Sequence, residues 1–129
     1  MARSSLTGTV ILVEDDASVS QALQRILRLA GLSPIHYESA EALLDARTGS
    51  DALCMIFDVQ LPGLDGFALY SQLSRRGGLP PVIFMTAFDE PEVRELARSA
   101  GAADFLAKPF SGHRLLETVR RVALPASPP

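Results

Sequence analysis

The sequence predicts an α/β protein built on a five-stranded, doubly wound parallel sheet. Five short apolar runs each precede a segment with helical spacing of its apolar residues, so a β-α unit occurs five times. The strongest runs are continuously apolar, as is typical of parallel strands that helices cover on both faces. They end on charged or hydroxyl residues, and in doubly wound sheets this is the edge where ligands bind.

Each predicted strand is marked by its own apolar run. The first is rich in β-branched residues, and the second is weaker and contains Pro34, which favours a sheet edge. The third and fourth are continuously apolar, and the fifth is short. In chain order they are residues 9–13, 33–37, 52–57, 82–85 and 103–107.

Each predicted helix is marked by apolar residues three and four positions apart. These faces are Val19, Leu23, Ile26, Leu27 and Ala30; Ala42, Leu43 and Ala46; Phe67, Tyr70 and Leu73; Val93, Leu96, Ala97 and Ala100; and Leu115, Leu116, Val119 and Val122. The last four helices have capping residues at their starts, namely Ser39, Asp65, Asp89 (with Glu92 reaching back to it) and Ser111. The first four are expected to end at Gly31, near residues 48–49, at 75–78 and at Gly101.

The composition is that of one globular domain. The chain has 129 residues, of which 47% are hydrophobic, and its net charge of −3 argues against a nucleic-acid-binding surface. No apolar run approaches the roughly 18 residues of a membrane span, so we expect a cytoplasmic protein. Cys54 is the single cysteine and is expected to be a reduced core residue. We expect a flexible N-terminus at residues 1–8, a folded domain at 9–123 and the start of a linker at 124–129.

Oxygen and nitrogen groups follow the strongest strands and are predicted to converge at one edge of the sheet. They are Glu14, Asp15 and Asp16 after the first strand, Asp58 after the third, Thr86 after the fourth and Lys108 after the fifth. Packed carboxylates repel one another, so either some of them are protonated or a cation lies among them, and oxygen ligands favour Mg²⁺ as that cation. No histidine or cysteine lies at a strand end, which argues against zinc; His36 and His113 are expected to be surface or helix-end residues.

This set of groups is typical of phosphoryl transfer. Asp58 is predicted to attack as the nucleophile while the metal and Lys108 neutralise charge on the transferring oxygens, and Thr86 donates a hydrogen bond to one of them. The chain has no glycine-rich loop of the P-loop or dinucleotide-binding kind, so the phosphoryl donor is expected to come from another molecule.

Four motifs in order resemble those of the receiver domain of two-component response regulators. They are Glu14-Asp15-Asp16, Asp58 with Leu61-Pro62-Gly63 and Asp65-Gly66, Thr86-Ala87, and Lys108-Pro109. The resemblance covers residues 10–122, nearly the whole chain. It implies a flavodoxin-like (βα)5 fold with strand order 2-1-3-4-5.

The resemblance also implies a role for each site residue. Asp58 would be the phosphoacceptor. The Mg²⁺ ion, or Mn²⁺ in its place, would be bound by Asp16 and Asp58 directly, by Asp15 through water and by the backbone carbonyl of Gln60. Thr86 would be the switch hydroxyl, Phe105 the aromatic switch residue and Lys108 the cation that pairs with the phosphate. The Lys108-Pro109 peptide would be cis, and Gln60 and Phe88 would modulate the lifetime of the phosphate.

By this resemblance the protein is a phosphorylation-activated switch, and not an enzyme beyond its own phosphoryl transfer and slow autodephosphorylation. A histidine kinase would phosphorylate Asp58, and the face around the fourth helix, fifth strand and fifth helix would change its affinity for a partner or promote a homodimer. The resemblance is to receivers that precede a helix-turn-helix DNA-binding domain, so DNA would be bound only through an output domain that this chain lacks.

Three alternatives stay open at the level of the sequence. Asp58 before a Pro-Gly turn could be a helix or turn cap. An aspartyl-phosphate phosphatase or phosphotransferase usually carries a second Asp two residues after the nucleophile, and this position is Gln60 here. A flavodoxin-like small-molecule binder, or a receiver that is not phosphorylated, is disfavoured by the complete acidic site.

Overall fold

The chain folds into a five-stranded parallel sheet with strand order β2-β1-β3-β4-β5, in a computed structural model that describes residues 6–47 and 51–123. This confirms the predicted fold class and strand order. The strands are β1 (Gly8–Val13), β2 (Leu32–Tyr37), β3 (Cys54–Asp58), β4 (Val82–Thr86) and β5 (Asp104–Ala107). As the sequence indicates, the weak, Pro34-containing strand β2 lies at an edge, and the continuously apolar β3 and β4 lie inside the sheet.

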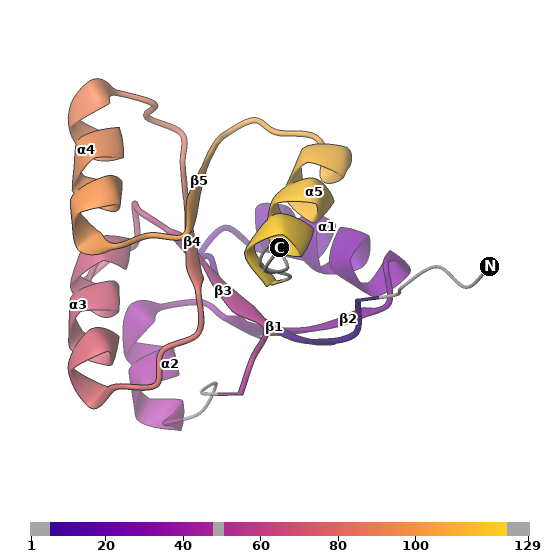
Figure 1. Cartoon of the computed structure of the whole chain (residues 1–129), viewed down its shortest axis with the longest axis horizontal. Coiled ribbons are helices and arrows are strands. Elements are labelled where there is room, and N and C mark those ends of the chain that lie inside the picture. Colours follow the sequence, from indigo (N-terminus) through magenta and orange to yellow (C-terminus); the bar gives the residue numbers. More distant parts are fainter. Residues whose placement is uncertain (1–5, 48–50, 124–129) are drawn as a thin grey trace, which may run out of the picture.

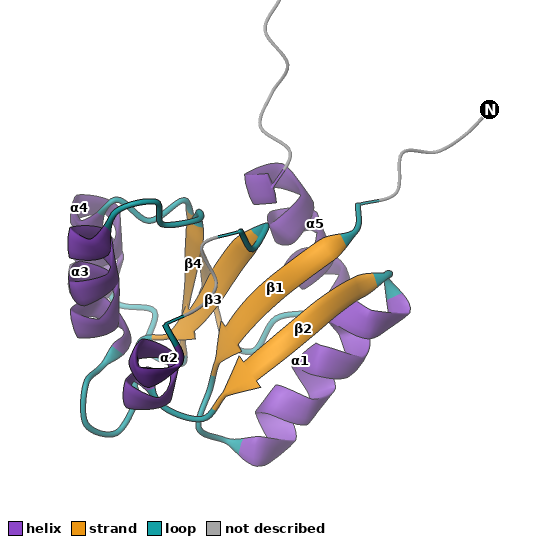
Figure 2. Ribbon diagram, turned by 90° about the horizontal axis from the view of Figure 1, so that it is seen from below, coloured by secondary structure: helices purple, strands orange, loops and turns teal. Residues whose placement is uncertain are grey.

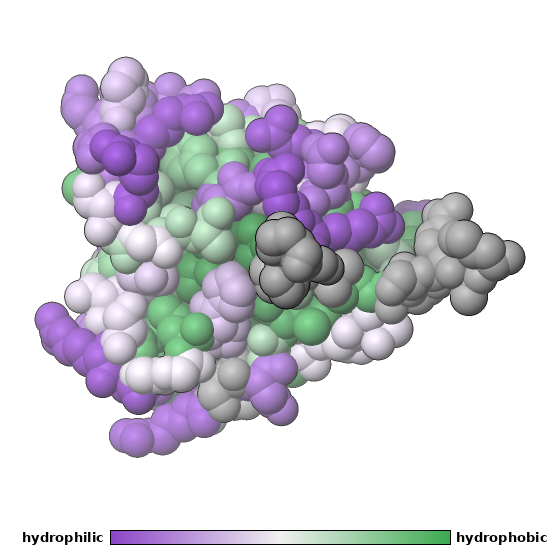
Figure 3. All heavy atoms as spheres, in the orientation of Figure 1, coloured by the Kyte–Doolittle hydropathy of each residue, from purple (hydrophilic) through white to green (hydrophobic). Residues whose placement is uncertain are grey.

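Helices cover both faces of the sheet (Figures 1 and 2). They are α1 (Ala17–Leu29), α2 (Ala40–Ala46), α3 (Gly66–Arg76), α4 (Pro91–Ala100) and α5 (Gly112–Ala123). α1 and α5 enclose one hydrophobic cluster against the sheet, and α2, α3 and α4 enclose the other. In the view of Figure 3, strongly hydrophilic residues gather over α4, and hydrophobic residues show in the middle of the face.

Phe84 on β4 is the centre of the cluster beneath α3. Its ring packs against the rings of Phe57, Phe67 and Tyr70 at centroid distances of 6.3, 4.8 and 5.7 Å. These edge-on and tilted arrangements are favourable for aromatic pairs. The strands that deliver Asp58 and Thr86 to the sheet edge are therefore fixed by close packing directly beneath them.

Two of the predicted helix faces need correction. In α2 the buried residues are Ala40, Leu43 and Leu44, whereas Ala46 is exposed. In α3 the predicted face is confirmed, since Leu73 is buried and the half-buried Phe67 and Tyr70 pack against the core; Leu69 joins them. In α4 only Ala97 is buried and Leu96 is 55% exposed, because the side that faces the sheet is the one that carries the small Ala97 and Ala100.

Most predicted caps are confirmed, but the cap of α4 is wrong. Ser39, Asp65 and Ser111 each accept a hydrogen bond from a backbone N–H in the first turn of the following helix. The N-cap of α4 is Glu90, which makes no side-chain capping bond. Asp89 instead pairs with the guanidinium of Arg94, since a two-point ion pair competes with a cap for the same oxygens.

The ends of the chain are described only in part. Residues 1–5, 48–50 and 124–129, which include most of the predicted flexible terminus, the predicted end of α2 and the linker, lie outside the described residues. Within the predicted flexible terminus, Leu6 packs against the core and Gly8 begins β1. Cys54 is buried as expected, and burial raises the pKa of its thiol to about 12. In the described part of the chain no helix has the length and apolarity to span a membrane.

The loop between β3 and α3 is closed tightly behind Asp58. The backbone N–H of Gly66 donates to the carbonyl of Val59 at 3.1 Å, so the start of α3 lies directly beside the end of β3. A Cβ atom at Gly66 would lie 2.5 Å from the backbone oxygen of Asp58 and 3.1 Å from Cα of Val59. Glycine is therefore needed at the first position of α3, because the atoms it approaches are backbone and cannot move aside.

Gly66→Ala is expected to lower the free energy of unfolding by about 1–3 kcal/mol, the usual cost of overpacking a closed site. Urea denaturation followed by circular dichroism measures this value. Ser74→Ala, an exposed substitution on the same helix, serves as the control and should change stability by less than about 0.5 kcal/mol. Equal stability of Gly66→Ala and the parent would contradict the close approach of α3 to β3.

Candidate functional site

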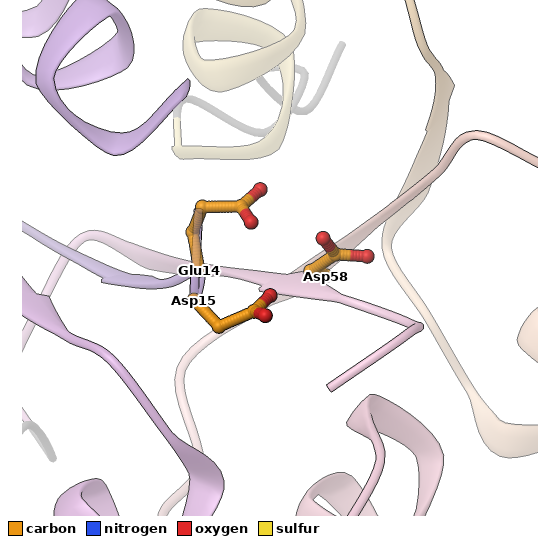
Figure 4. A group of neighbouring side chains, drawn as sticks. All are labelled: Glu14, Asp15 and Asp58. Carbon is orange, nitrogen blue, oxygen red and sulfur yellow. The ribbon is translucent and has the colours of Figure 1, made fainter. Parts of the chain in front are cut away.

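Three carboxylates meet at the carboxyl edge of the sheet. Asp58 is the last residue of β3, and Glu14 and Asp15 directly follow β1, its neighbour in the sheet. One oxygen of each side chain lies within 4.8 Å of the others. Glu14 and Asp15 leave β1 on opposite sides, and both turn toward Asp58 (Figure 4). Asp58 and Glu14 are buried, with exposures of 4% and 1%, whereas Asp15 opens to solvent.

The ammonium group of Lys108 binds two of these carboxylates. Its Nζ donates to Oδ2 of Asp58 and to Oε1 of Glu14, both at 2.8 Å. Burial, the largest influence, lowers the pKa of Lys108, but the hydrogen bonds and charges of Asp58 and Glu14 outweigh it, so the pKa is raised overall. The sequence contains no other lysine. The predicted convergence of Asp58 and Lys108 is confirmed, and the Lys108-Pro109 peptide is cis as predicted.

Asp16, predicted as the direct metal ligand, does not join the acidic group. Its Oδ1 accepts the backbone N–H groups of Ser18 and Val19 and the hydroxyl of Ser18, so it is the N-cap of α1. The Ser18 hydroxyl is the main cause that lowers the pKa of Asp16, followed by these backbone bonds. Because α1 begins immediately after the three acidic residues, the free N–H groups of its first turn bind the last of them, Asp16. Glu14, to which the resemblance assigned no metal role, lies in the cluster instead.

Thr86 lies at the end of β4 with its side chain fully buried. Its hydroxyl donates to Oε1 of Gln60 at 2.8 Å and accepts the backbone N–H of Phe88 at 3.0 Å. The backbone N–H of Gln60 in turn donates to Oδ1 of Asp58 at 2.9 Å. Gln60 therefore touches both Asp58 and Thr86, and sequence reasoning did not anticipate this use of its side chain.

Phe105, the predicted aromatic switch residue, is half-buried on β5. The guanidinium carbon of Arg94 lies 5.1 Å from the centre of its ring, which is the geometry of a cation–π contact. Arg94 also binds Asp89 in the loop between β4 and α4, the same loop whose Phe88 N–H binds Thr86. The contacts thus run from Thr86 through this loop to Phe105.

His36 is a second residue that the sequence did not assign to the site. It is half-buried on the edge strand β2, and its Nε2 lies 2.7 Å from the backbone carbonyl of Glu14. A carbonyl oxygen only accepts, so Nε2 carries the hydrogen. The expectation of a surface or helix-end residue is wrong for His36, whereas His113 is exposed near the start of α5. Only the pairing of β1 with β2 brings His36 beside Glu14.

The donor set fits a hard divalent cation. Glu14, Asp15 and Asp58 offer only oxygens, and with Lys108 their formal charges leave the cluster at −2 when all are ionised. Clustered negative charge of this kind is stabilised by a cation, and carboxylate oxygens are the ligands preferred by Mg²⁺ and Mn²⁺. The three carboxylates are close enough to one another to hold such an ion, and the cluster opens to solvent at Asp15.

Fold and site together define a class of protein: a small doubly wound α/β domain whose acidic, lysine-paired site lies at the carboxyl edge of the sheet. The sequence matches the response regulator receiver domain family over residues 10–120. The chain belongs to this family, and so to the phosphorylation-activated switches of two-component signalling.

Sequence relatives agree with this membership. The DNA-binding transcriptional regulator NtrC of Klebsiella pneumoniae is 40% identical over 103 residues, which are 80% of this chain and 22% of NtrC. The transcriptional regulatory protein FixJ of Bradyrhizobium diazoefficiens is 34% identical over 123 residues, 93% of this chain and 60% of FixJ. The chain thus spans less than two thirds of the length of these relatives.

Solved structures share the fold. The chemotaxis response regulator CheY4 of Vibrio cholerae superposes with a TM-score of 0.82 at 27% identity, covering 91% of this chain and 99% of CheY4. The non-phosphorylated HemR receiver domain from Leptospira biflexa gives a TM-score of 0.84 at 24% identity, covering 95% and 98% of the two chains. The second likeness supports the fold alone.

Proposed function

We propose that Asp58 accepts a phosphoryl group from a phosphohistidine of a partner histidine kinase. The observation that carries this proposal is the environment of its carboxylate: Oδ1 is held by the Gln60 N–H and Oδ2 by Lys108, inside an acidic cluster that suits a divalent cation. A carboxylate oxygen attacks phosphorus, the P–N bond of the donor breaks with its electron pair on the imidazole nitrogen, and an acyl phosphate forms.

The metal ligands of this proposal differ from those expected from the sequence. Asp15 and Asp58 would hold Mg²⁺, or Mn²⁺, directly, together with the backbone carbonyl of Gln60, while Glu14 would act through a bound water. Asp16 is left out because its oxygen is engaged by the first turn of α1. When bound, the ion neutralises negative charge on the transferring oxygens.

The remaining site residues act on the product. Lys108 would pair with a phosphoryl oxygen on Asp58, since its Nζ already reaches that carboxylate. Thr86 would donate its hydroxyl hydrogen to another oxygen. Gln60 and Phe88 would modulate the lifetime of the acyl phosphate. Phe88 is 56% exposed and has no group that could activate water, which supports slow autodephosphorylation.

The output face would be the surface of α4, β5 and α5 around Phe105. Two hollows of about 470 and 450 Å³ share Phe105, Arg94 and Asp104 in their walls, so a movement of the ring changes both. Phe105 has no hydroxyl, and its position would be sensed through packing and through the Arg94 contact. This face would control a phosphorylation-dependent homodimer or an output domain.

The partners follow from the relatives by analogy. NtrC and FixJ are named as transcriptional regulators, and each extends well beyond the matched region. We infer a transcriptional output domain beyond this chain as the part that contacts DNA, and a cytoplasmic location in which a kinase and this output domain are both accessible.

The test is phosphorylation by acetyl phosphate and Mg²⁺, followed by intact-protein mass spectrometry. The parent is expected to gain one phosphoryl group, and Asp58→Asn to gain none, because the amide is not a nucleophile for phosphorus. Asp65→Asn is the matched control: it lies in the same loop, Asn also caps helices, and it should be phosphorylated like the parent. No gain in the parent, or a gain in Asp58→Asn, would refute the assignment.

A further inference from the structure

Gln60 binds the hydroxyl group that phosphorylation is expected to recruit. Its Oε1 accepts the Thr86 hydroxyl at 2.8 Å, while its own backbone N–H binds Asp58 at 2.9 Å. The Thr86 oxygen also accepts the N–H of Phe88 at 3.0 Å. Gln60 therefore stands between the phosphoacceptor and the switch hydroxyl, with its backbone on one and its side chain on the other.

A hydroxyl group has a single hydrogen to donate. In this structure that hydrogen is given to Gln60, so it is not available to an oxygen on Asp58. We propose that Gln60 is a positioning residue that restrains Thr86 in its unphosphorylated arrangement, because its side-chain carbonyl competes with the phosphoryl group for the Thr86 hydrogen. This inference rests on the proposed function and adds to it what sets the threshold of the switch.

Burial makes this competition one-sided. Thr86 is fully buried, so its hydroxyl needs a partner at all times, whereas Gln60 is exposed and its carbonyl can accept from water instead. A charged phosphoryl oxygen is a stronger acceptor than an amide, and it therefore wins the exchange. The hydrogen bond between Thr86 and Gln60 is lost in this exchange. The free energy that Thr86 gains by binding the phosphoryl oxygen is therefore reduced by the strength of the bond to Gln60.

The restraint extends beyond the site. Because Phe88 N–H binds the same Thr86 oxygen, a shift of this oxygen displaces the loop between β4 and α4. That loop carries Asp89, whose partner Arg94 lies over the ring of Phe105. The side chain of Gln60 thus holds the first contact of a series that ends at Phe105, while its backbone contact with Asp58 does not depend on the side chain.

Gln60→Met removes the competing acceptor and keeps the length of the side chain. Free Thr86 then lacks an acceptor for its hydrogen, and a phosphoryl group, or beryllofluoride as its mimic, supplies one. We expect Gln60→Met to bind beryllofluoride more tightly than the parent, by between about twofold and tenfold, the range of one net hydrogen bond. The unliganded variant is expected to be less stable than the parent by a matching factor in its unfolding equilibrium.

Beryllofluoride binding is measured by NMR in excess Mg²⁺ on protein labelled at lysine Cε. Lys108 is the only lysine, so the spectrum contains one lysine side-chain signal, and its Nζ lies 2.8 Å from Asp58. The titration is run on the parent, Gln60→Met and the control Gln72→Met, an exposed glutamine on α3. The effect of Gln60→Met is then measured in two further backgrounds: Thr86→Val, where the hydroxyl is absent, and Thr86→Ser, where the hydroxyl is kept. If Thr86→Val does not fold, Thr86→Ala takes its place.

If Gln60 restrains Thr86, Gln60→Met binds beryllofluoride more tightly than the parent, and Gln72→Met binds it like the parent. In the Thr86→Val background Gln60→Met should bring no gain in affinity, whereas in the Thr86→Ser background the gain should remain. Equal or weaker binding in Gln60→Met would overturn it, and so would a gain that survives without the Thr86 hydroxyl. If the parent itself fails to bind beryllofluoride, the proposed function fails together with the inference; if the parent binds and Gln60→Met does not differ, only the inference fails.

Discussion

Lys108→Met is expected to destabilise the free domain by about 2–4 kcal/mol at neutral pH. The substitution leaves the buried carboxylates of Asp58 and Glu14 without their shared counter-charge, and breaking a buried ion pair by removing one partner typically costs about 3–5 kcal/mol. The lower range is used because the lysine side chain is 20% exposed, so solvent screens part of its charge. Urea denaturation in the absence of divalent ions measures the loss.

The pH dependence of this loss distinguishes charge from packing. In Lys108→Met the two carboxylates stay buried without the cation that binds them in the parent. A group with a raised folded pKa contributes stability that is present below its unfolded pKa and lost as pH rises through the folded value, so the deficit of the variant should be constant near neutral pH and shrink above pH 10.5. In the parent the raised pKa of Lys108 means that the lysine contribution is lost only above pH 10.5, its ordinary value.

Lys108→Arg is the control for this prediction, since it keeps the positive charge and alters the geometry. It should retain most of the stability, while the single-point contact of an ammonium with a phosphoryl oxygen is lost. A deficit in Lys108→Met that does not change with pH would show that the lysine acts through its aliphatic chain alone.

Asp15→Asn is expected to abolish the response to divalent ions and to stabilise the ion-free domain by about 1 kcal/mol. The amide removes one of three clustered negative charges, and with it the repulsion between them. In the parent, Mg²⁺ binds only the folded state and should raise stability with concentration by mass action. In Asp15→Asn the same series should show no rise. Thermal unfolding across an Mg²⁺ series, with Mn²⁺ binding by electron paramagnetic resonance, measures both effects.

Asp16→Ala is the matched control, and it separates the two assignments of the metal ligand. The substitution removes the cap of α1 and so lowers stability, but it should leave the rise in stability with Mg²⁺ intact. If Asp16→Ala loses the Mg²⁺ response and Asp15→Asn keeps it, Asp16 is the metal ligand, as expected from the sequence alone.

Local patterns account for what the sequence predicted correctly. Continuous apolar runs such as 52–57 and 82–85 predict strands inside a parallel sheet, because few other structures bury every residue of a segment. Asp58, Thr86 and Lys108 stand at the ends of three of these strands. They lie at one edge of the sheet because the carboxyl ends of parallel strands are on the same side. Neither conclusion needs a knowledge of how the helices are rotated against the sheet.

The structure and the sequence-based expectations differ at two places where adjacent residues are alike. Asp15 and Asp16 are adjacent acids, and the N–H groups of α1 bind the one that follows β1 at the right distance. Leu96 and Ala97 were both expected on the inner face of α4, but the side that can approach the sheet carries only the smaller of them. In each case both residues suit their position by type, and the geometry of packing decides between them.

The sequence by itself determined the five-stranded sheet, the parallel direction of its strands and the meeting of acid, hydroxyl and ammonium at one edge, because periodicity and strand ends are local properties. Only the tertiary structure decided which acids gather around Asp58, that His36 holds the carbonyl of Glu14, and that Gln60 takes the hydrogen of Thr86. These contacts join residues on different strands and loops. They depend on strand register and loop closure, which fix separations of a few ångströms that sequence spacing does not encode.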